Sequence, residues 1–117
     1  MNTKLKQGSI ITVDFDPAKG SEIQKRRPAV VISRDEYQLA ANLMIVCPIT
    51  STPKKTPYLV PVHGETLKAG SKVNTKQVYT MDHTEAGGRN VKVIGELSKR
   101  DFLMVAQHFL QNFNFPF

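Results

Sequence analysis

The pattern of hydrophobic and polar positions predicts a chain built mainly of short β-strands. Apolar and β-branched residues gather in brief runs, which are separated by turn-forming Pro, Gly, Asn and Asp. We predict strands over residues 9–15, 28–33, 43–49, 58–62 and 91–97, with one or two more in 71–81, and a short helix or wide loop over 35–42. Because Pro61 interrupts the run 58–62, that segment should be an edge strand.

The C-terminal segment has a different periodicity, which predicts one amphipathic helix that packs on the sheet and ends near Asn112. Ser98 and Asp101 match a capping box, with Asp in place of the usual Glu. The apolar positions that follow have helical spacing and form one stripe: Phe102, Leu103, Val105, Ala106, Phe109, Leu110 and Phe113. Several short strands followed by one helix predict a single domain, residues 1–117, with a small, strongly bent sheet or barrel.

The composition is that of a folded domain with a net positive charge. The 117 residues are 40% hydrophobic and 22% charged, which is typical of a folded domain. Sixteen Lys and Arg against ten Asp and Glu give a net charge of +6, which favours anionic partners such as nucleic acids but equally favours solubility.

Cysteine and histidine usage excludes several kinds of site. The single cysteine, Cys47, excludes a disulfide framework and a cysteine-rich zinc site, and the three histidines lack metal-ligand spacing, so we expect no metal and no cofactor. The sequence has neither a secretory signal nor an apolar run of about 18 residues, so we expect a cytoplasmic protein without membrane contact.

Three polar clusters are candidates for chemistry. Residues 20–28 (GSEIQKRRP) place one carboxylate and three cations between two predicted strands. Residues 48–52 (PITST) end a buried strand with three hydroxyls, and residues 74–77 (NTKQ) carry base-reading amides and a lysine within a predicted strand. Taken singly, each cluster also fits a structural interpretation: a solvated loop, a turn, or the polar face of a strand.

Together these clusters resemble a known family. Residues 8–33 resemble the N-terminal signature of the MazF/PemK/Kid toxin family, in which a strand ending in DFDP precedes KGSE, a basic loop and RPAVV. Residues 46–51 (VCPITS) are similar to its second signature, and residues 76–82 (KQVYTMD) to a third, weaker one. The resemblance covers roughly residues 8–112 in the same order and spacing.

The resemblance implies a fold and a function. It implies a small, SH3-like, strongly curved antiparallel β-barrel with a C-terminal helix, assembled as a homodimer. It also implies an endoribonuclease that cleaves single-stranded RNA at short motifs without metal and is inhibited by a cognate antitoxin. Attack by the 2′-hydroxyl of the RNA would leave a 2′,3′-cyclic phosphate and a 5′-hydroxyl.

The resemblance also implies roles for individual residues. Arg27 matches the catalytic arginine that stabilises the phosphorane, Thr50 the threonine that bonds the scissile phosphate, and Glu22 a candidate base or arginine orienter. The residues expected to bind substrate are Ser51, Gln77, Lys25, Arg26, Asn74 and Lys76.

The chain departs from the Kid branch of the family. Asn74 and Lys76 stand where Kid carries its proposed acid–base pair, and Ser21 replaces a histidine, so a Kid-like pair is not expected. Two other functions remain open: a catalytically silent barrel that binds nucleic acid or protein, and a gyrase-directed toxin of the CcdB type. The RPAVV and PITS segments favour the ribonuclease branch.

Overall fold

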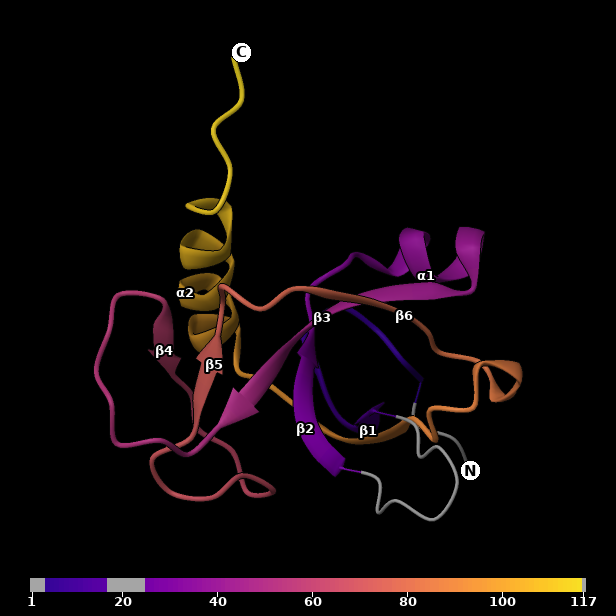
Figure 1. Cartoon of the computed structure of the whole chain (residues 1–117), viewed down its shortest axis with the longest axis horizontal. Coiled ribbons are helices and arrows are strands. Elements are labelled where there is room, and N and C mark those ends of the chain that lie inside the picture. Colours follow the sequence, from indigo (N-terminus) through magenta and orange to yellow (C-terminus); the bar gives the residue numbers. More distant parts are fainter. Residues whose placement is uncertain (1–3, 17–24, 117) are drawn as a thin grey trace.

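The computed structural model describes residues 4–16 and 25–116. Its elements, drawn in Figure 1, follow in the order β1 (Ser9–Asp16), β2 (Lys25–Val31), α1 (Asp35–Ala41), β3 (Leu43–Thr50), β4 (Leu59–Pro61), β5 (Lys72–Asn74), β6 (Tyr79–Asp82), the 3-10 turn η1 (Glu85–Gly87), β7 (Lys92–Glu96) and α2 (Lys99–Leu110). The segment 35–42, left open by the sequence, is therefore mostly helical, and residues 71–81 contain two strands. No helix among the described residues is long and apolar enough to cross a membrane.

All strands belong to one antiparallel sheet in the order β4-β5-β3-β2-β1-β7, with β6 also paired to β3. Figure 1 shows the sheet curving strongly, with α2 against its β4–β5 end. This confirms the predicted curved antiparallel sheet with a C-terminal helix, and it confirms β4 as an edge strand. In the described part of the chain the path of paired strands is open, with β4 and β7 at its ends.

The middle strand β3 has a different partner along each part of its length. Its first half pairs with β6, up to Val46 opposite Tyr79, and its last residues pair with β5, where Ile49 lies opposite Val73. Between these two ladders the chain leaves β3 for residues 75–78. Pro48 lies at this interruption, where its missing N–H costs the ladder least.

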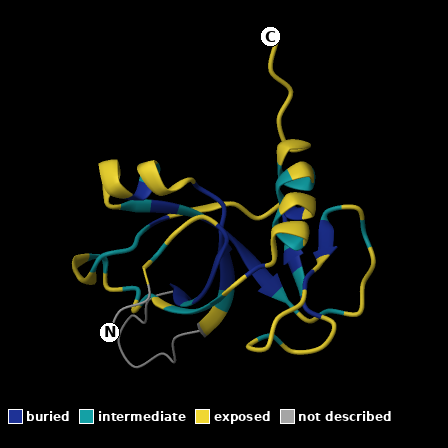
Figure 2. Cartoon of the chain, turned by 180° about the vertical axis from the view of Figure 1, so that it is seen from behind, coloured by how far each residue is buried: buried dark blue, intermediate teal, exposed yellow. Residues whose placement is uncertain are grey.

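Both faces of the curved sheet are apolar, because alternate residues of the strands enter two separate cores. Ile10, Val30 and Cys47 point to the core beneath α2, which also holds Val105. Their neighbours in the strands point to the core that the curved sheet itself encloses: Ile11, Val13, Ala29, Val31, Met44, Val46 and Met81. Figure 2 shows this buried interior along β1, β2 and β3.

The cap of α2 forms as predicted, but only half of the capping box does. The Ser98 hydroxyl accepts a hydrogen bond from the Asp101 amide at 3.1 Å. The Asp101 carboxylate is engaged elsewhere, by the amide of His63 at 2.8 Å and by the His63 ring at 3.1 Å. This pair ties the start of α2 to the loop after β4.

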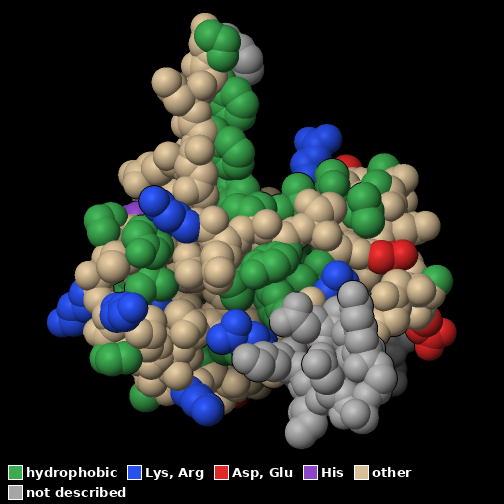
Figure 3. All heavy atoms as spheres, viewed as in Figure 1, with side chains coloured by type: hydrophobic (Ala, Val, Ile, Leu, Met, Phe, Trp, Pro, Cys, Tyr) green, Lys and Arg blue, Asp and Glu red, His purple; other side chains and the backbone are tan. Residues whose placement is uncertain are grey.

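The apolar stripe of α2 is only partly buried, which corrects the sequence interpretation. Val105 is fully buried, and Phe102 and Phe109 pack on the core. Leu103 and Leu110, placed in the same stripe by the sequence, are 57% and 61% exposed. Figure 3 shows apolar side chains running along one side of α2 and the tail that follows it.

Cys47 lies at the centre of the sheet and is fully buried. Burial raises the pKa of its thiol to about 12. We therefore expect the folded protein to resist iodoacetamide at pH 8.5 and to be labelled readily once unfolded in urea, as followed by mass spectrometry. Rapid labelling of the folded protein would contradict the packing of β3 described here.

Candidate active site

Arg27 and Thr50 come together at one end of the β2–β3 ladder. The paired ladder ends at Ala29 opposite Pro48, and the same register continued by two residues sets Arg27 opposite Thr50. Since side chains alternate along a strand, both belong to the face that Ala29 and Val31 occupy further along. The apolar run of this face thus ends in a guanidinium and a hydroxyl.

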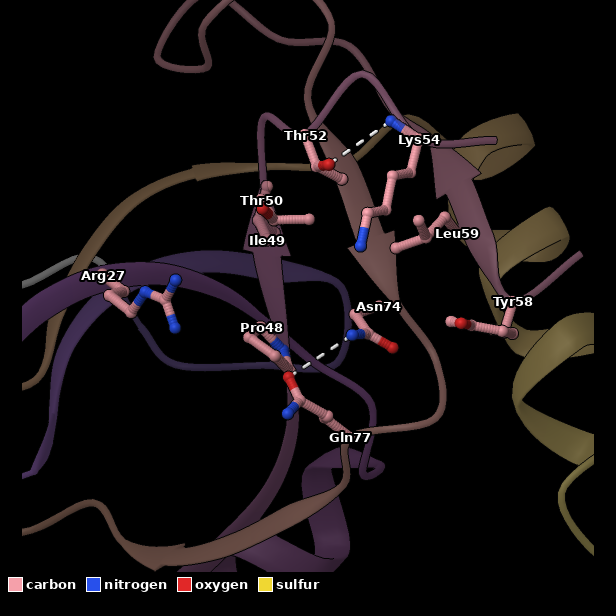
Figure 4. Close-up of a pocket in the computed structure, with 10 residues that line it drawn as sticks. All are labelled: Arg27, Pro48, Ile49, Thr50, Thr52, Lys54, Tyr58, Leu59, Asn74 and Gln77. Atoms are coloured by element: carbon pink, nitrogen blue, oxygen red, sulfur yellow. Dashed lines mark hydrogen bonds between the residues drawn. The ribbon is translucent and has the colours of Figure 1, made fainter. Parts of the chain in front are cut away.

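Two hollows meet at these side chains, because Arg27 and Thr50 line both of them. The first hollow, of about 260 Å³, is drawn in Figure 4, where Arg27 points from β2 toward β3. Asn74 at the end of β5 and Gln77 in the segment that follows face this hollow, and Lys54 and Tyr58 stand on its far side. The remaining lining residues are Pro48, Ile49, Thr52 and Leu59.

The second hollow, of about 420 Å³, lies between β2, the end of β3 and the loop that precedes β5. Apart from Arg27 and Thr50 it is lined by Thr12, Arg26, Pro28, Ile49, Ser51, Thr66, Leu67, Lys68 and Ser71. Hydroxyls and cations dominate this lining, and such groups suit a phosphodiester backbone.

The electrostatics of both hollows favour an anion. No Asp or Glu of the described residues lines either one, whereas Arg26, Arg27, Lys54 and Lys68 do. On the face drawn in Figure 3, most of the Lys and Arg side chains lie on the β4–β5 side, and most of the Asp and Glu side chains lie on the side of α1. Arg27 is exposed and makes no hydrogen bond or ion pair with another described residue, so its guanidinium can meet a phosphate.

Arg26, the neighbour of Arg27, points to the opposite face and is held by the protein. Its guanidinium contacts the Asp14 carboxylate at 3.2 Å and the Thr12 hydroxyl at 2.8 Å. Asp14 is nearly buried, with 6% of its side chain exposed, against 32% for Arg26. Arg26 therefore neutralises a buried carboxylate, besides contributing to the second hollow.

Residues 74–77 form a turn between β5 and β6, which corrects the predicted strand. The Gln77 amide donates to the Asn74 carbonyl at 3.3 Å, and the Lys76 amide donates to the Asn74 side-chain oxygen at 3.1 Å. The Asn74 amide group also donates to the Gln77 side-chain oxygen at 3.3 Å. The turn keeps both predicted amides at the first hollow, whereas an unbroken strand would send them to opposite faces, because residues 74 and 77 are an odd number of positions apart.

Of the remaining residues that the sequence predicted for the site, only Ser51 lines one hollow alone, and the others lie elsewhere or outside the described residues. Ser51 lines only the second hollow. Lys76 lines neither hollow, and its ammonium lies 5.0 Å from the centre of the Tyr58 ring. Lys25 is the first residue of β2, and Glu22 lies outside the described residues.

Sequence reasoning missed two polar residues of the first hollow, Lys54 and Tyr58, and singled out Thr52 only as one hydroxyl of the segment 48–52. They belong to the loop after β3 and its junction with β4, which a sequence pattern shows only as a polar, proline-containing segment. The available signal was a pair of lysines one residue after the PITST segment, with an aromatic residue, Tyr58, three positions later. Within the described residues, no three His, Cys, Asp or Glu side chains gather in a group that could hold a metal ion.

Comparison with known proteins gives consistent matches. Residues 6–113 match the family described as PemK-like, MazF-like toxin of type II toxin-antitoxin system. The endoribonuclease MazF9 of Mycobacterium tuberculosis is 34% identical over 102 residues, covering 80% of this chain and 83% of that protein. The Escherichia coli endoribonuclease toxin MazF is 41% identical over 58 residues. This match spans about half of each protein, 50% of this chain and 52% of MazF.

Solved structures agree in fold. MazF within a MazE–MazF complex from Deinococcus radiodurans superposes with a TM-score of 0.76 at 25% identity, covering 92% of this chain and 94% of that one. A mycobacterial endoribonuclease, solved in complex with its cognate antitoxin, superposes with a TM-score of 0.72 at 14% identity. The match covers 97% of this chain and 100% of that chain.

The two adjacent arginines should respond differently to removal. Arg26→Ala takes one partner from a buried carboxylate, so we expect it to lower the free energy of unfolding by about 1–3 kcal/mol. Arg27→Ala should change it by no more than about 0.5 kcal/mol, because Arg27 is exposed and has no described partner to lose. Urea denaturation of both variants measures this difference, and equal destabilisation would contradict the assignment.

Proposed function

The chain belongs to the PemK/MazF family of toxins of type II toxin–antitoxin systems, and on this premise we propose that it is a cytoplasmic endoribonuclease that cleaves single-stranded RNA at short sequence motifs. One observation carries the proposal: Arg27 and Thr50, from two different strands, line the same hollows. A cation and a hydroxyl that converge in this way can hold a single phosphate.

The proposed reaction uses the RNA's own 2′-hydroxyl as nucleophile. The 2′-oxygen forms a bond to phosphorus and gives up its proton, while the bond to the 5′-oxygen breaks and that oxygen takes a proton. The products are a 2′,3′-cyclic phosphate and a 5′-hydroxyl, and no external oxidant or metal is required. The charge that develops on the phosphorane is the main obstacle, which fixed cations and hydroxyls can offset.

We assign Arg27 to charge stabilisation at the phosphorane and Thr50 to a hydrogen bond with a phosphate oxygen. Lys54, across the first hollow, adds a second cation to the same space. Glu22 is the proposed base or the group that orients Arg27. An arginine is a poor proton donor, since its pKa lies above about 12, so Arg27 is not assigned as the acid.

Substrate binding is proposed to use the lining of both hollows. Asn74 and Gln77 present amides that suit base edges, and the Tyr58 ring offers a face for stacking. Ser51 and Arg26 are assigned to the RNA backbone on the side of the second hollow, and Lys76 to the backbone near Tyr58. Lys25 is assigned to backbone binding as well.

Two protein partners are proposed. The first is a cognate antitoxin with an acidic, disordered tail that covers the basic hollows, since a structurally similar mycobacterial endoribonuclease has been solved in complex with its cognate antitoxin. The second is another copy of this chain. Leu103, Met104 and Leu110 leave an apolar strip of α2 exposed, which a second copy would cover.

Removal of either central side chain should abolish cleavage. We expect Arg27→Ala and Thr50→Ala each to lower kcat/KM for single-stranded RNA by at least about 100-fold, because each removes a group that stabilises the transition state. The assay uses a chelator throughout, and circular dichroism verifies the fold. Arg34→Ala and Thr80→Ala, which change exposed side chains that line neither hollow, serve as matched controls.

Other outcomes of this assay identify the competing functions. RNA that stays intact with the unaltered protein, although it binds, would indicate a silent binding module. Intact RNA accompanied by gyrase-dependent DNA breaks would indicate a gyrase-directed toxin.

The chemistry of the nucleophile has its own test. An RNA with a single 2′-deoxy nucleotide on the 5′ side of the cleaved bond should bind normally and remain uncut, because the attacking oxygen is absent. Mass spectrometry of the products of unmodified RNA should find a 2′,3′-cyclic phosphate. Cleavage of the deoxy-substituted RNA, or a 5′-phosphate product, would contradict the mechanism.

A further inference from the structure

The side chain of Asn112 lies outside both hollows but is hydrogen-bonded to the turn that carries Asn74 and Gln77, which line the first hollow. Asn112 follows α2, and its side-chain amide donates a hydrogen bond to the carbonyl oxygen of Thr75. Thr75 is the second residue of the turn formed by residues 74–77. The contact therefore joins the end of α2 to the wall of the first hollow.

Thr75 is anchored from a second side as well. Its amide donates to the Tyr58 carbonyl at 2.9 Å, and its hydroxyl donates to the same oxygen at 2.7 Å. The residue is fully buried. All three polar groups of Thr75 are thus engaged, two by the residue before β4 and one by Asn112.

The first and last residues of the turn, Asn74 and Gln77, differ from the buried Thr75 because they face the first hollow. Asn74 and Gln77 line the first hollow, and their mutual hydrogen bonds are local to the turn. Local bonds define the shape of a four-residue turn but not its position relative to β3. Asn74 is positioned by its pairing with Leu59, whereas residues 75–78 belong to no strand and depend on the buried anchor.

We propose that Asn112 is a positioning residue for RNA recognition: by clamping Thr75 it holds the Asn74–Gln77 turn at the correct distance from Arg27 and Thr50. The inference rests on the proposed ribonuclease function. It assigns Asn112 to binding and sequence selectivity and not to the chemical step, because strand pairing holds Arg27 opposite Val13 of β1 and Thr50 opposite Lys72 of β5. An effect confined to binding raises KM and leaves kcat unchanged.

The test compares four variants with the unaltered protein. Asn112→Ala removes the donor, and Asn112→Asp keeps the shape but replaces the donor with an acceptor. Gln111→Ala is the matched control, since that residue is adjacent and takes part in the cap of α2 only through its backbone. A chain ending at Asn112 removes the aromatic residues that follow while keeping the clamp.

The substrate is a short single-stranded RNA that contains the cleavage sequence of the unaltered protein, mapped from the 5′ ends of cut transcripts. For Asn112→Ala and Asn112→Asp we expect KM to rise about two- to tenfold, the range that one lost hydrogen bond gives, with kcat unchanged. Cleavage at single-base variants of the sequence should become relatively more frequent. Gln111→Ala and the shortened chain should match the unaltered protein.

A second measurement is independent of activity. Hydrogen exchange at the amides of Lys76 and Gln77, both bonded within the turn, should be faster in Asn112→Ala, with exchange at Val30 and Val46 unchanged. Unchanged exchange in the turn, an unchanged KM, or an equal rise in KM for the shortened chain would overturn the proposal. If the unaltered protein cuts no RNA, the ribonuclease function fails, while faster exchange in the turn still supports the clamp.

Discussion

The fold depends on β3, because this one strand pairs with three others. β2 covers one of its edges, and the other edge is divided between β6 and β5. A strand that is buried on both faces and bonded on both edges must be apolar along most of its length, as Met44, Val46 and Cys47 are. The first hydroxyl side chain appears at Thr50, where the strand ends and its surroundings open.

The site follows from this arrangement by strand alternation alone. The face that holds Ala29 in the enclosed core leads two residues away on β2 to Arg27, and from Pro48, opposite Ala29, two residues along β3 to Thr50. Polar groups placed there are carried by rigid backbone and yet reach solvent. The same alternation explains why Arg26 differs from its neighbour: it points to the other face, where the nearly buried Asp14 needs a cation.

The sequence predicted the strands and the last helix well, because their signals are local: apolar runs, Pro61 at an edge, and Ser98 as a cap. It also selected Arg27, Thr50, Asn74 and Gln77, through residues that resemble family signatures. It did not predict the turn at residues 74–77, since that break arises where β3 exchanges one partner for another. Lys54 and Tyr58 were missed for a similar reason: a loop's position in the fold is not encoded in its own residues.

The proposed function places the chemistry and the recognition of RNA on different parts of the fold. The two groups that would meet the scissile phosphate stand on neighbouring strands, whose relative position is set by backbone hydrogen bonds and two apolar cores. The amides that would read bases stand on a short turn, which is held at one buried threonine by side-chain and main-chain bonds from two separate segments. A ladder tolerates few changes, because each residue is fixed by pairing and burial, whereas a turn with a single anchor accepts changes at its other positions. Under the proposed function, substitution at the turn would therefore alter which sequence is cut without disturbing how it is cut.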